Sequence, residues 1–263
     1  MLANILRIAK MEYKENMYYK LNVILEGMNS VIEIIVYIFI WMAIYGKESV
    51  INSMNIEQMS TYYILSISLA LIVEWGIDSQ IGNSIRKGQV NRELLNPISY
   101  FQYYFGKKLG ETAYMAIISV GAFAICSIIF GVILPANIFH FISFIIMVSV
   151  NIVILFFIDI IIGMCAFYTN MIWGMTVFRK AIITICSGLI APITLFPIWF
   201  QNISKILPFQ EFIYTPVSIY MGMIEEKEIL LTFGKQIIWV LVLYVIAKKF
   251  YNRAIKNITI NGG

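Results

Sequence analysis

The chain has 263 residues, of which 60% are hydrophobic and only 13% are charged, with a formal net charge of +4. A soluble domain carries about twice that charged fraction, so the composition excludes a soluble globular protein. The apolar residues fall in runs near or above the roughly 18–20 residues that cross a bilayer. We therefore expect an all-α membrane protein with six transmembrane helices in a single domain, residues 21–263, after a short N-terminal helix.

Residues 1–20 predict an amphipathic helix. Its cations Arg7, Lys10 and Lys14 fall on one face, and apolar residues fall on the opposite face: Leu2, Ile5, Leu6, Ala9 and Tyr13. Such a helix is expected to lie along the lipid headgroups, with its cations facing acidic lipid or a cytoplasmic partner. Lipid anchoring alone is the simpler of these two interpretations.

The first two spans are expected at about residues 21–45 and 61–77. Glu33 lies deep in the first span, where an unpaired carboxylate is costly, so we expect it to face a protein interface or a cavity. Both a substrate or proton role and a hydrogen-bonded packing role fit this position. Glu74 and Asp78 lie on one helical face at the inner end of the second span. Their expected partners are cations of the following loop or of the N-terminal helix.

The stretch 79–111 is polar and aromatic within an otherwise apolar sequence, and we interpret it as a cytoplasmic loop. It carries five cations: Arg86, Lys87, Arg92, Lys107 and Lys108. Gly88 follows a predicted helix end, and Val90, Leu94 and Leu95 are spaced for one face of a short helix that Pro97 would end. A short, partly apolar helix there has little to bury against except another protein. The alternative is an ordinary solvated loop.

The third and fourth spans are expected at about residues 109–134 and 138–167, with Asp159 in the inner half of the fourth. A polar turn at 168–180 then carries Trp173, Arg179 and Lys180, which we interpret as interfacial anchors.

The fifth span is expected to begin near Ala181 and to be interrupted soon by Gly188 and by a series of prolines: Pro192, Pro197, Pro208 and Pro216. Each proline removes a backbone donor, and broken backbone at membrane depth persists only where protein or a watery cavity covers it. We therefore interpret residues 200–223 as short half-helices that dip into the outer leaflet. The last span is expected at about residues 233–247.

Topology follows from the cations. Fifteen of the 19 Lys and Arg residues lie in the N-terminal helix, the 79–111 loop, the 168–180 turn and the tail. With six spans these four segments share one side, and the positive-inside rule predicts that this side, with both termini, is cytoplasmic.

Motifs for catalysis do not occur. The sequence has no phosphate-binding loop, no H-E-x-x-H and no G-x-S-x-G, and its single histidine excludes a multi-histidine metal site. We expect no catalytic residue and no bound metal. Glu33 and Asp159 are the one loose pair of intramembrane acids. As a proton or ion site they would define a secondary transporter, although the two halves of the chain show no repeat that would favour this class.

Two stretches resemble the ABC type-2 permease family, the membrane subunits of ATP-binding-cassette exporters. The first is IRKGQVNRELLNPISYFQYYFGKKLGE, and the second is SGLIAPITLFPIWFQNISKILPFQEFIYTPVSIYMG. The segment AFYTNMIWG is also similar to a family stretch, with Tyr168 in place of the usual tryptophan. The resemblance covers nearly the whole chain and is closest to small bacterial exporter permeases that work in pairs with a separate ATPase.

The resemblance implies roles for two sets of residues. The first set would form a coupling helix in a cleft of the ATPase: Gly88, Val90, Arg92, Glu93, Leu94, Leu95 and Pro97. Of these, Val90, Leu94 and Leu95 would supply apolar contacts, and Arg92 and Glu93 would supply charged contacts at the rim. The second set would form re-entrant half-helices that close the pathway on the outside: Pro192, Pro197, Pro208, Phe209, Tyr214 and Pro216.

The resemblance also implies the partners. ATP and magnesium would bind to the ATPase subunit, with no cofactor in this chain, and a second permease, identical or a sister chain, would complete the pathway. The implied setting is the bacterial plasma membrane, with lipid but no nucleic acid as a further partner. The implied cargo is amphiphilic, such as a peptide, a drug or a lipid. A structural or immunity membrane protein without transport is the remaining alternative.

Overall fold

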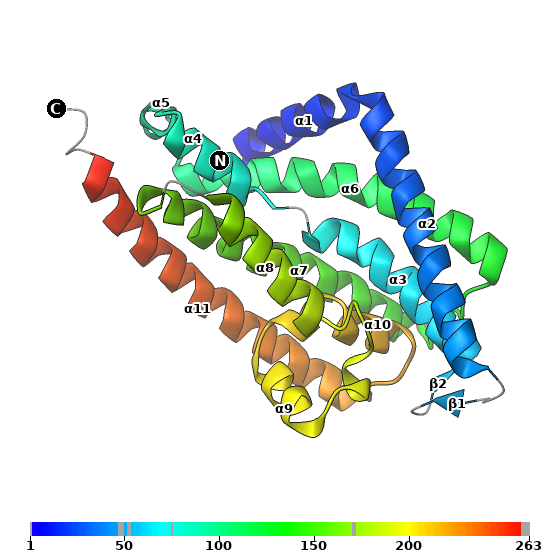
Figure 1. Ribbon diagram of the computed structural model, residues 1–263. Coiled ribbons are helices and arrows are strands. Elements are labelled where there is room, and N and C mark those ends of the chain that lie inside the picture. Colours follow the sequence, from blue (N-terminus) through cyan, green and yellow to red (C-terminus); the bar gives the residue numbers. More distant parts are fainter. Residues whose placement is uncertain (1, 47–49, 52–53, 75, 170–171, 259–263) are drawn as a thin grey trace.

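The computed structural model describes residues 2–46, 50–51, 54–74, 76–169 and 172–258, and these are almost entirely helical (Figure 1). Within this part of the chain, five helices are long and apolar enough to cross a membrane. They are α2 (Lys20–Tyr45), α3 (Ile56–Glu74) continued by α4 (Asp78–Arg86), α6 (Tyr100–Phe130), α7 (Ile138–Met164) and α11 (Glu226–Ile258). The only described strands are the two-residue pair β1 (Val50–Ile51) and β2 (Met54–Asn55), which run antiparallel. The prediction of an all-α membrane protein is confirmed.

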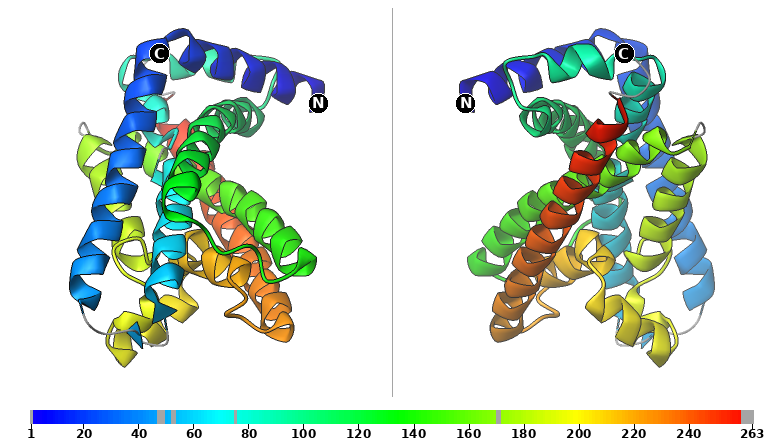
Figure 2. Two further views of the ribbon diagram at one scale, coloured as in Figure 1. Left: turned by 90° about the vertical axis from the view of Figure 1, so that its right-hand side faces the viewer. Right: turned by 90° about the vertical axis from the view of Figure 1, so that its left-hand side faces the viewer.

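The two ends of the helix bundle differ. Helix α1 (Leu2–Tyr18) lies across one end, beside α5 (Val90–Leu94) and the C-terminal end of α11, and we call this the α5 end (Figures 1 and 2). The β1–β2 hairpin and α9 (Ile198–Ile206) lie at the opposite end, the α9 end. The N-terminal helix, the segment around residue 90 and the tail therefore share one end, as the distribution of cations predicted.

Helix α3 forms the centre of the core. Its residues 59–70 are all buried, and α2, α6, α7 and α10 (Tyr214–Tyr220) pack around it. A helix that is apolar on all faces is stable only when it is enclosed, and α3 has almost no hydrophobic asymmetry. The largest of its enclosed side chains are Tyr62 and Tyr63.

Residues 79–111 are mostly helical rather than a loop, and the short helix predicted to begin at Val90 is present as α5. Helix α4 covers the first part, α5 follows after a turn at Gly88 (φ +69°), and α6 already begins at Tyr100 rather than near residue 109. Lys107 and Lys108 therefore belong to a transmembrane helix and not to a solvated loop. Polar composition misled here because α4 and the start of α6 bury polar side chains against each other and against α7 and α8.

The polar turn predicted at 168–180 is also wrong in most of its length. A short 3-10 helix, η1 (Cys165–Phe167), ends the fourth span, and α8 (Ile172–Cys186) begins nine residues before the predicted Ala181. Arg179 lies inside α8 and is only 3% exposed, so it is not an interfacial anchor, whereas Trp173 is exposed. With 15 residues α8 is shorter than a bilayer-crossing helix. The sixth span stays a prediction.

The prolines after α8 start short helices. Pro192, Pro197 and Pro208 immediately precede η2 (Ile193–Leu195), α9 and η3 (Phe209–Phe212), and Pro216 lies in the first turn of α10. Proline is well suited to these positions, because its fixed φ fits a helix and its missing N–H would have no partner in the first turn. The predicted interruption of this segment is confirmed.

Helix α1 is packed on α6 through two glycines. A Cβ atom at Gly106 would lie 2.9 Å from the Cβ of Ile8, and one at Gly110 would lie 2.7 Å from the Cβ of Glu12 and would also overlap the carbonyl oxygen of Ala9. Small residues at this spacing let two helices approach closely. The face of α1 that meets α6 includes Ile5, whereas Leu2 and Leu6, expected on the same face, are exposed.

Replacing Gly110 by alanine should separate α1 from α6. Overpacking of this kind costs about 1–3 kcal/mol, so we expect a lower unfolding temperature in detergent and faster proteolysis within α1. Gly121→Ala is the matched control, because it lies on the same helix and its added Cβ would meet no atom within 4 Å. Equal stability of the two variants would show that the α1–α6 contact is not close.

Candidate functional site

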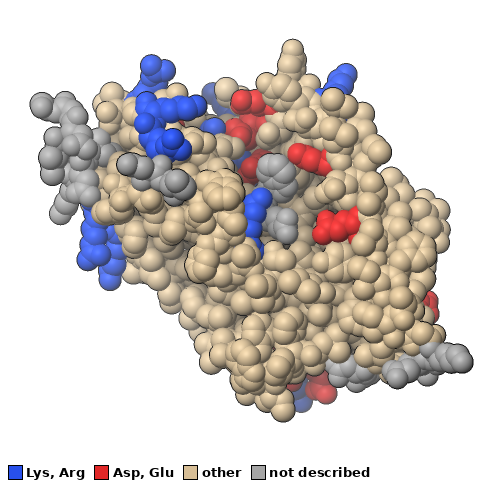
Figure 3. Space-filling model, viewed as in Figure 1, with Lys and Arg blue, Asp and Glu red and all other residues tan. Residues whose placement is uncertain are grey.

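The α5 end exposes a group of cations around one apolar side chain. Arg86, Lys87 and Arg92 are exposed, as are Leu95, at 86%, and Pro97. We call these five residues the α5 surface. Figure 3 shows Lys and Arg gathering over this corner of the molecule. A leucine so fully exposed among cations is not lipid-facing, because the hydrocarbon region excludes charge, and it marks a contact surface.

Two of the residues predicted for this surface point inward instead. Val90 is only 4% exposed and belongs to the main core. The carboxylate of Glu93 accepts hydrogen bonds from the Ser84 hydroxyl (2.7 Å) and the Tyr104 hydroxyl (2.8 Å), which lie on α4 and α6. Leu94 is half-buried against the core. Glu93 therefore ties α5 rigidly to the two neighbouring helices, and the α5 surface is held in a fixed position.

Directly below α4 lies a cluster of four buried charges that we call the ionic cluster: Asp78, Lys108, Asp159 and Arg179. Arg179 Nε lies 3.2 Å from Asp78 Oδ2, and its Nη1 lies 3.5 Å from Asp159 Oδ1. Lys108 Nζ lies 3.3 Å from Asp159 Oδ2. All four side chains are within 2% of complete burial. The cluster joins α4, α6, α7 and α8 through two positive and two negative groups.

The break between α3 and α4 is built around Asp159. The Ile77 N–H donates to Asp159 Oδ2 (3.3 Å), so this carboxylate satisfies a backbone donor that the interrupted helix leaves free. A Cβ at Gly76 would lie 2.5 Å from Asp159 Oδ1 and 2.7 Å from Arg179 Nη2. Only glycine fits at this position. Because Gly76 has no side chain, Asp159 and Arg179 can lie directly against the backbone at the break between α3 and α4.

Glycines on α4 and α7 allow close helix packing in the same part of the bundle. A Cβ at Gly163 of α7 would overlap Ile81 of α4, and a Cβ at Gly82 of α4 would overlap Ile172 of α8. Helix α4 is therefore in close contact with both α7 and α8. A shift of α4 along its axis must move side chains on both neighbours.

Helix α1 is linked to this region by a second polar group. The Glu12 carboxylate accepts a hydrogen bond from the Gln80 amide (3.0 Å) and lies 3.4 Å from the Lys107 ammonium. Lys107 in turn donates to Gln80 (3.0 Å). The amphipathic helix therefore contacts both α4 and α6, and its acidic side chain is one of the contacts.

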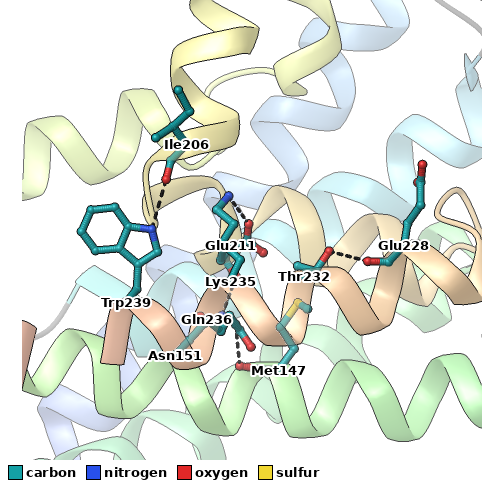
Figure 4. Close-up of polar contacts among 9 residues, drawn as sticks. All are labelled: Met147, Asn151, Ile206, Glu211, Glu228, Thr232, Lys235, Gln236 and Trp239. Atoms are coloured by element: carbon teal, nitrogen blue, oxygen red, sulfur yellow. Dashed lines mark hydrogen bonds and ion pairs between the residues drawn. The ribbon is translucent and has the colours of Figure 1, made fainter. Parts of the chain in front are cut away.

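At the α9 end, polar side chains hold the proline-rich segment to the bundle (Figure 4). Lys235 of α11 donates to the Glu211 carboxylate (2.6 Å), and Asn151 of α7 donates to the Glu211 carbonyl. Gln236 donates to Asn151 (2.8 Å), and Trp239 donates to the carbonyl of Ile206 (3.1 Å).

The start of this segment is held by two tyrosines of α3. The Tyr62 hydroxyl donates to the Gly188 carbonyl (2.6 Å), and the Tyr63 hydroxyl donates to the Ile190 carbonyl (2.7 Å). Gly188 has φ +88°, which a side chain would strain. Of the residues predicted for an outer gate, Pro192, Pro208 and Pro216 are buried, Phe209 and Tyr214 are half-buried, and Pro197 is exposed.

Asp159, one of the two intramembrane acids, is ion-paired. It contacts Ile77, Lys108 and Arg179, and Glu33 is half-buried on α2. The expected partners of Asp78 were cations of the loop or of α1, but its cation is Arg179 of α8. The side chain of Glu74 lies outside the described residues. The Asp159 carboxylate is thus engaged by cations of α6 and α8.

Sequence reasoning missed the roles of Lys108, Arg179 and Glu93. One signal was available in the sequence. A carboxylate deep in an apolar span, such as Asp159, requires a buried cation as its partner, and only a few cations lie near the ends of the spans. Among the described residues there is no group of three His, Cys, Asp or Glu side chains that could hold a metal ion.

The comparison with protein families gives one match. The family model described as ABC-2 family transporter protein matches residues 31–262. No curated protein matches the chain.

Replacing Arg179 by methionine should destabilise the protein strongly. Removing one partner from a buried ion pair costs about 3–5 kcal/mol, because Asp78 would lose its ion pair and Asp159 would lose one of its two. The measurement is the unfolding temperature of the purified protein by tryptophan fluorescence. Arg253→Met, at an exposed position, is the matched control. Adding Asp78→Asn to Arg179→Met should restore part of the loss, and no restoration would contradict the pairing.

Proposed function

Because the chain belongs to the ABC-2 family of transporter proteins, we propose that it is the membrane-spanning permease subunit of an ABC exporter, driven by a separate ATPase subunit. The chain itself has no phosphate-binding loop, so ATP and magnesium would bind to the partner. A second permease, identical or a sister chain, would complete the pathway in the plasma membrane of a bacterium. The substrate would be amphiphilic, such as a peptide, a drug or a lipid.

The observation that carries this proposal is the α5 surface. It presents an exposed leucine and three cations on and around α5, a helix that Glu93 ties to its neighbours. A coupling helix needs both properties, since it must dock into a partner and must transmit force without bending. The docking contacts would come from Leu95, Arg92 and Pro97, with Val90 and Glu93 holding the helix from within.

The ionic cluster gives this force a route into the bundle. Movement of α5 would act on α4, which precedes it in the chain and is joined to it by the Ser84–Glu93 hydrogen bond. Helix α4 bears Asp78 in its first turn. Through Arg179 and Asp159 the movement would reach α8 and α7. ATP-driven closure of the ATPase would thus shift the helices that lead to the α9 end.

The proline-rich segment would close the pathway on the outside. Its short helices are anchored to α3, α7 and α11 by hydrogen bonds, so movement of those helices would reposition it. The cations at the α5 end and the positive-inside rule support an orientation with both termini in the cytoplasm. Helix α1 would brace the ATPase from the membrane surface.

Leu95→Asp should abolish docking of the ATPase. A central apolar anchor contributes about 2 kcal/mol or more to an interface, so co-purification of the ATPase with the tagged chain should fall at least about tenfold. The chain should still fold and insert, because Leu95 makes little contact within the protein.

Leu134→Asp serves as the control, since Leu134 is 76% exposed but precedes α7 at the α9 end. It should leave the complex intact. If the ATPase remains bound to the Leu95→Asp protein, or if no ATPase copurifies with the wild type from its native membrane, the proposed function is wrong.

A further inference from the structure

A groove of about 540 Å³ lies between α6 and α11, on the surface of α7, near the α5 end. It arises because α11 packs along α7, whereas α6 turns away from α7 to pack against α1, α2 and α3. None of the functions discussed above uses this groove.

The polar side chains that line the groove lie toward the α5 end, where Phe101 and Tyr251 also lie. On α6, Ser99 and Gln102 lie nearer the α5 end than Phe105, and on α11, Asn252 and Lys248 lie nearer that end than Tyr244. Asn252 and Tyr244 are eight residues apart, or about 12 Å along the helix. This placement of the polar side chains follows the change from headgroups to hydrocarbon within one leaflet.

The apolar part of the groove is preformed by interlocked rings. Phe156 packs against Phe101, Phe105 and Phe157, with ring centroids 5.1–6.4 Å apart. Phe157 in turn packs edge-on against Tyr244 at 5.6 Å. These contacts hold the side chains in place, so the groove does not depend on a ligand to open it.

The charge of the groove is one-sided. Lys248 is its single charged lining residue and is exposed, and none of the lining residues is acidic. Lys249 and Arg253 follow on the same helix, and no Asp or Glu occurs in the chain after Glu228. An anion at the polar end of the groove would therefore meet Lys248, and no acidic side chain of the lining would compete with it.

We propose that this groove binds an anionic phospholipid from the leaflet at the α5 end. The phosphate lies at Lys248, with Asn252 and Gln102 as hydrogen-bond partners of the headgroup, and the acyl chains lie over Phe105, Phe156 and Phe157. The site places a lipid between α6 and α11, beside the point where Tyr251 of α11 packs directly against Tyr100 and Phe101 of α6. It stands independently of the proposed transport function.

The test is lipid binding to the full purified chain in mild detergent, measured by native mass spectrometry. Phosphatidylglycerol is the probe, and phosphatidylcholine is the zwitterionic comparison. A cation near the membrane surface contributes about 1 kcal/mol to binding of an anionic lipid, so Lys248→Gln should weaken phosphatidylglycerol binding about fivefold and leave phosphatidylcholine unchanged.

Lys249→Gln is the matched control, because Lys249 adjoins Lys248 but does not line the groove. It should bind phosphatidylglycerol nearly as wild type does. Val153→Trp, which fills the apolar floor, should weaken binding of both lipids. Equal binding of the two lipids by wild type, equal effects of the two lysine changes, or cross-linking of a cysteine at Gln102 to a second copy of the chain would overturn the proposal.

Discussion

The fold depends on burying four charges together at the α5 end. An isolated ion of this size costs several kcal/mol to remove from water, and the cost is offset only when each charge meets its opposite in good geometry. Asp78, Lys108, Asp159 and Arg179 meet this condition only if α4, α6, α7 and α8 are all in place. The ion pairs therefore hold the four helices together, and they also favour only the arrangement in which all four helices are in place.

The two ends of the molecule use the same solution for irregular backbone. At the α5 end, Asp159 accepts the N–H of Ile77 where the second span breaks. At the α9 end, Asn151 and the two tyrosines of α3 donate to carbonyls of the proline-rich segment. In each case a side chain on a continuous helix satisfies backbone that has lost its helical partner, which a membrane otherwise forbids. Between the two ends, α3 is held by apolar packing.

Local signals in the sequence predicted the class and much of the fold. Apolar runs located five long helices, and the prolines correctly predicted the break after Gly188, because both effects act within a few residues. The cluster could not be predicted, since its members are up to 101 residues apart and pair only through packing. Counting cations placed Lys108 and Arg179 at a surface, because such a count treats every cation near a span end as solvated. Glu93 and Val90 were assigned to an interface because helical spacing does not say which face turns inward.

Arg179 lies between carboxylates on two different helices, α4 and α7. A displacement of α4 that lengthens the contact with Asp78 leaves the guanidinium still paired with Asp159, so the cost falls on the buried Asp78 carboxylate. The cluster thus holds α4 and α5 in one position. It also lets these two helices move at the cost of a single contact, the one between Arg179 and Asp78. If interdigitated leucines alone held these helices together, the same motion would disturb contacts along the whole helix interface.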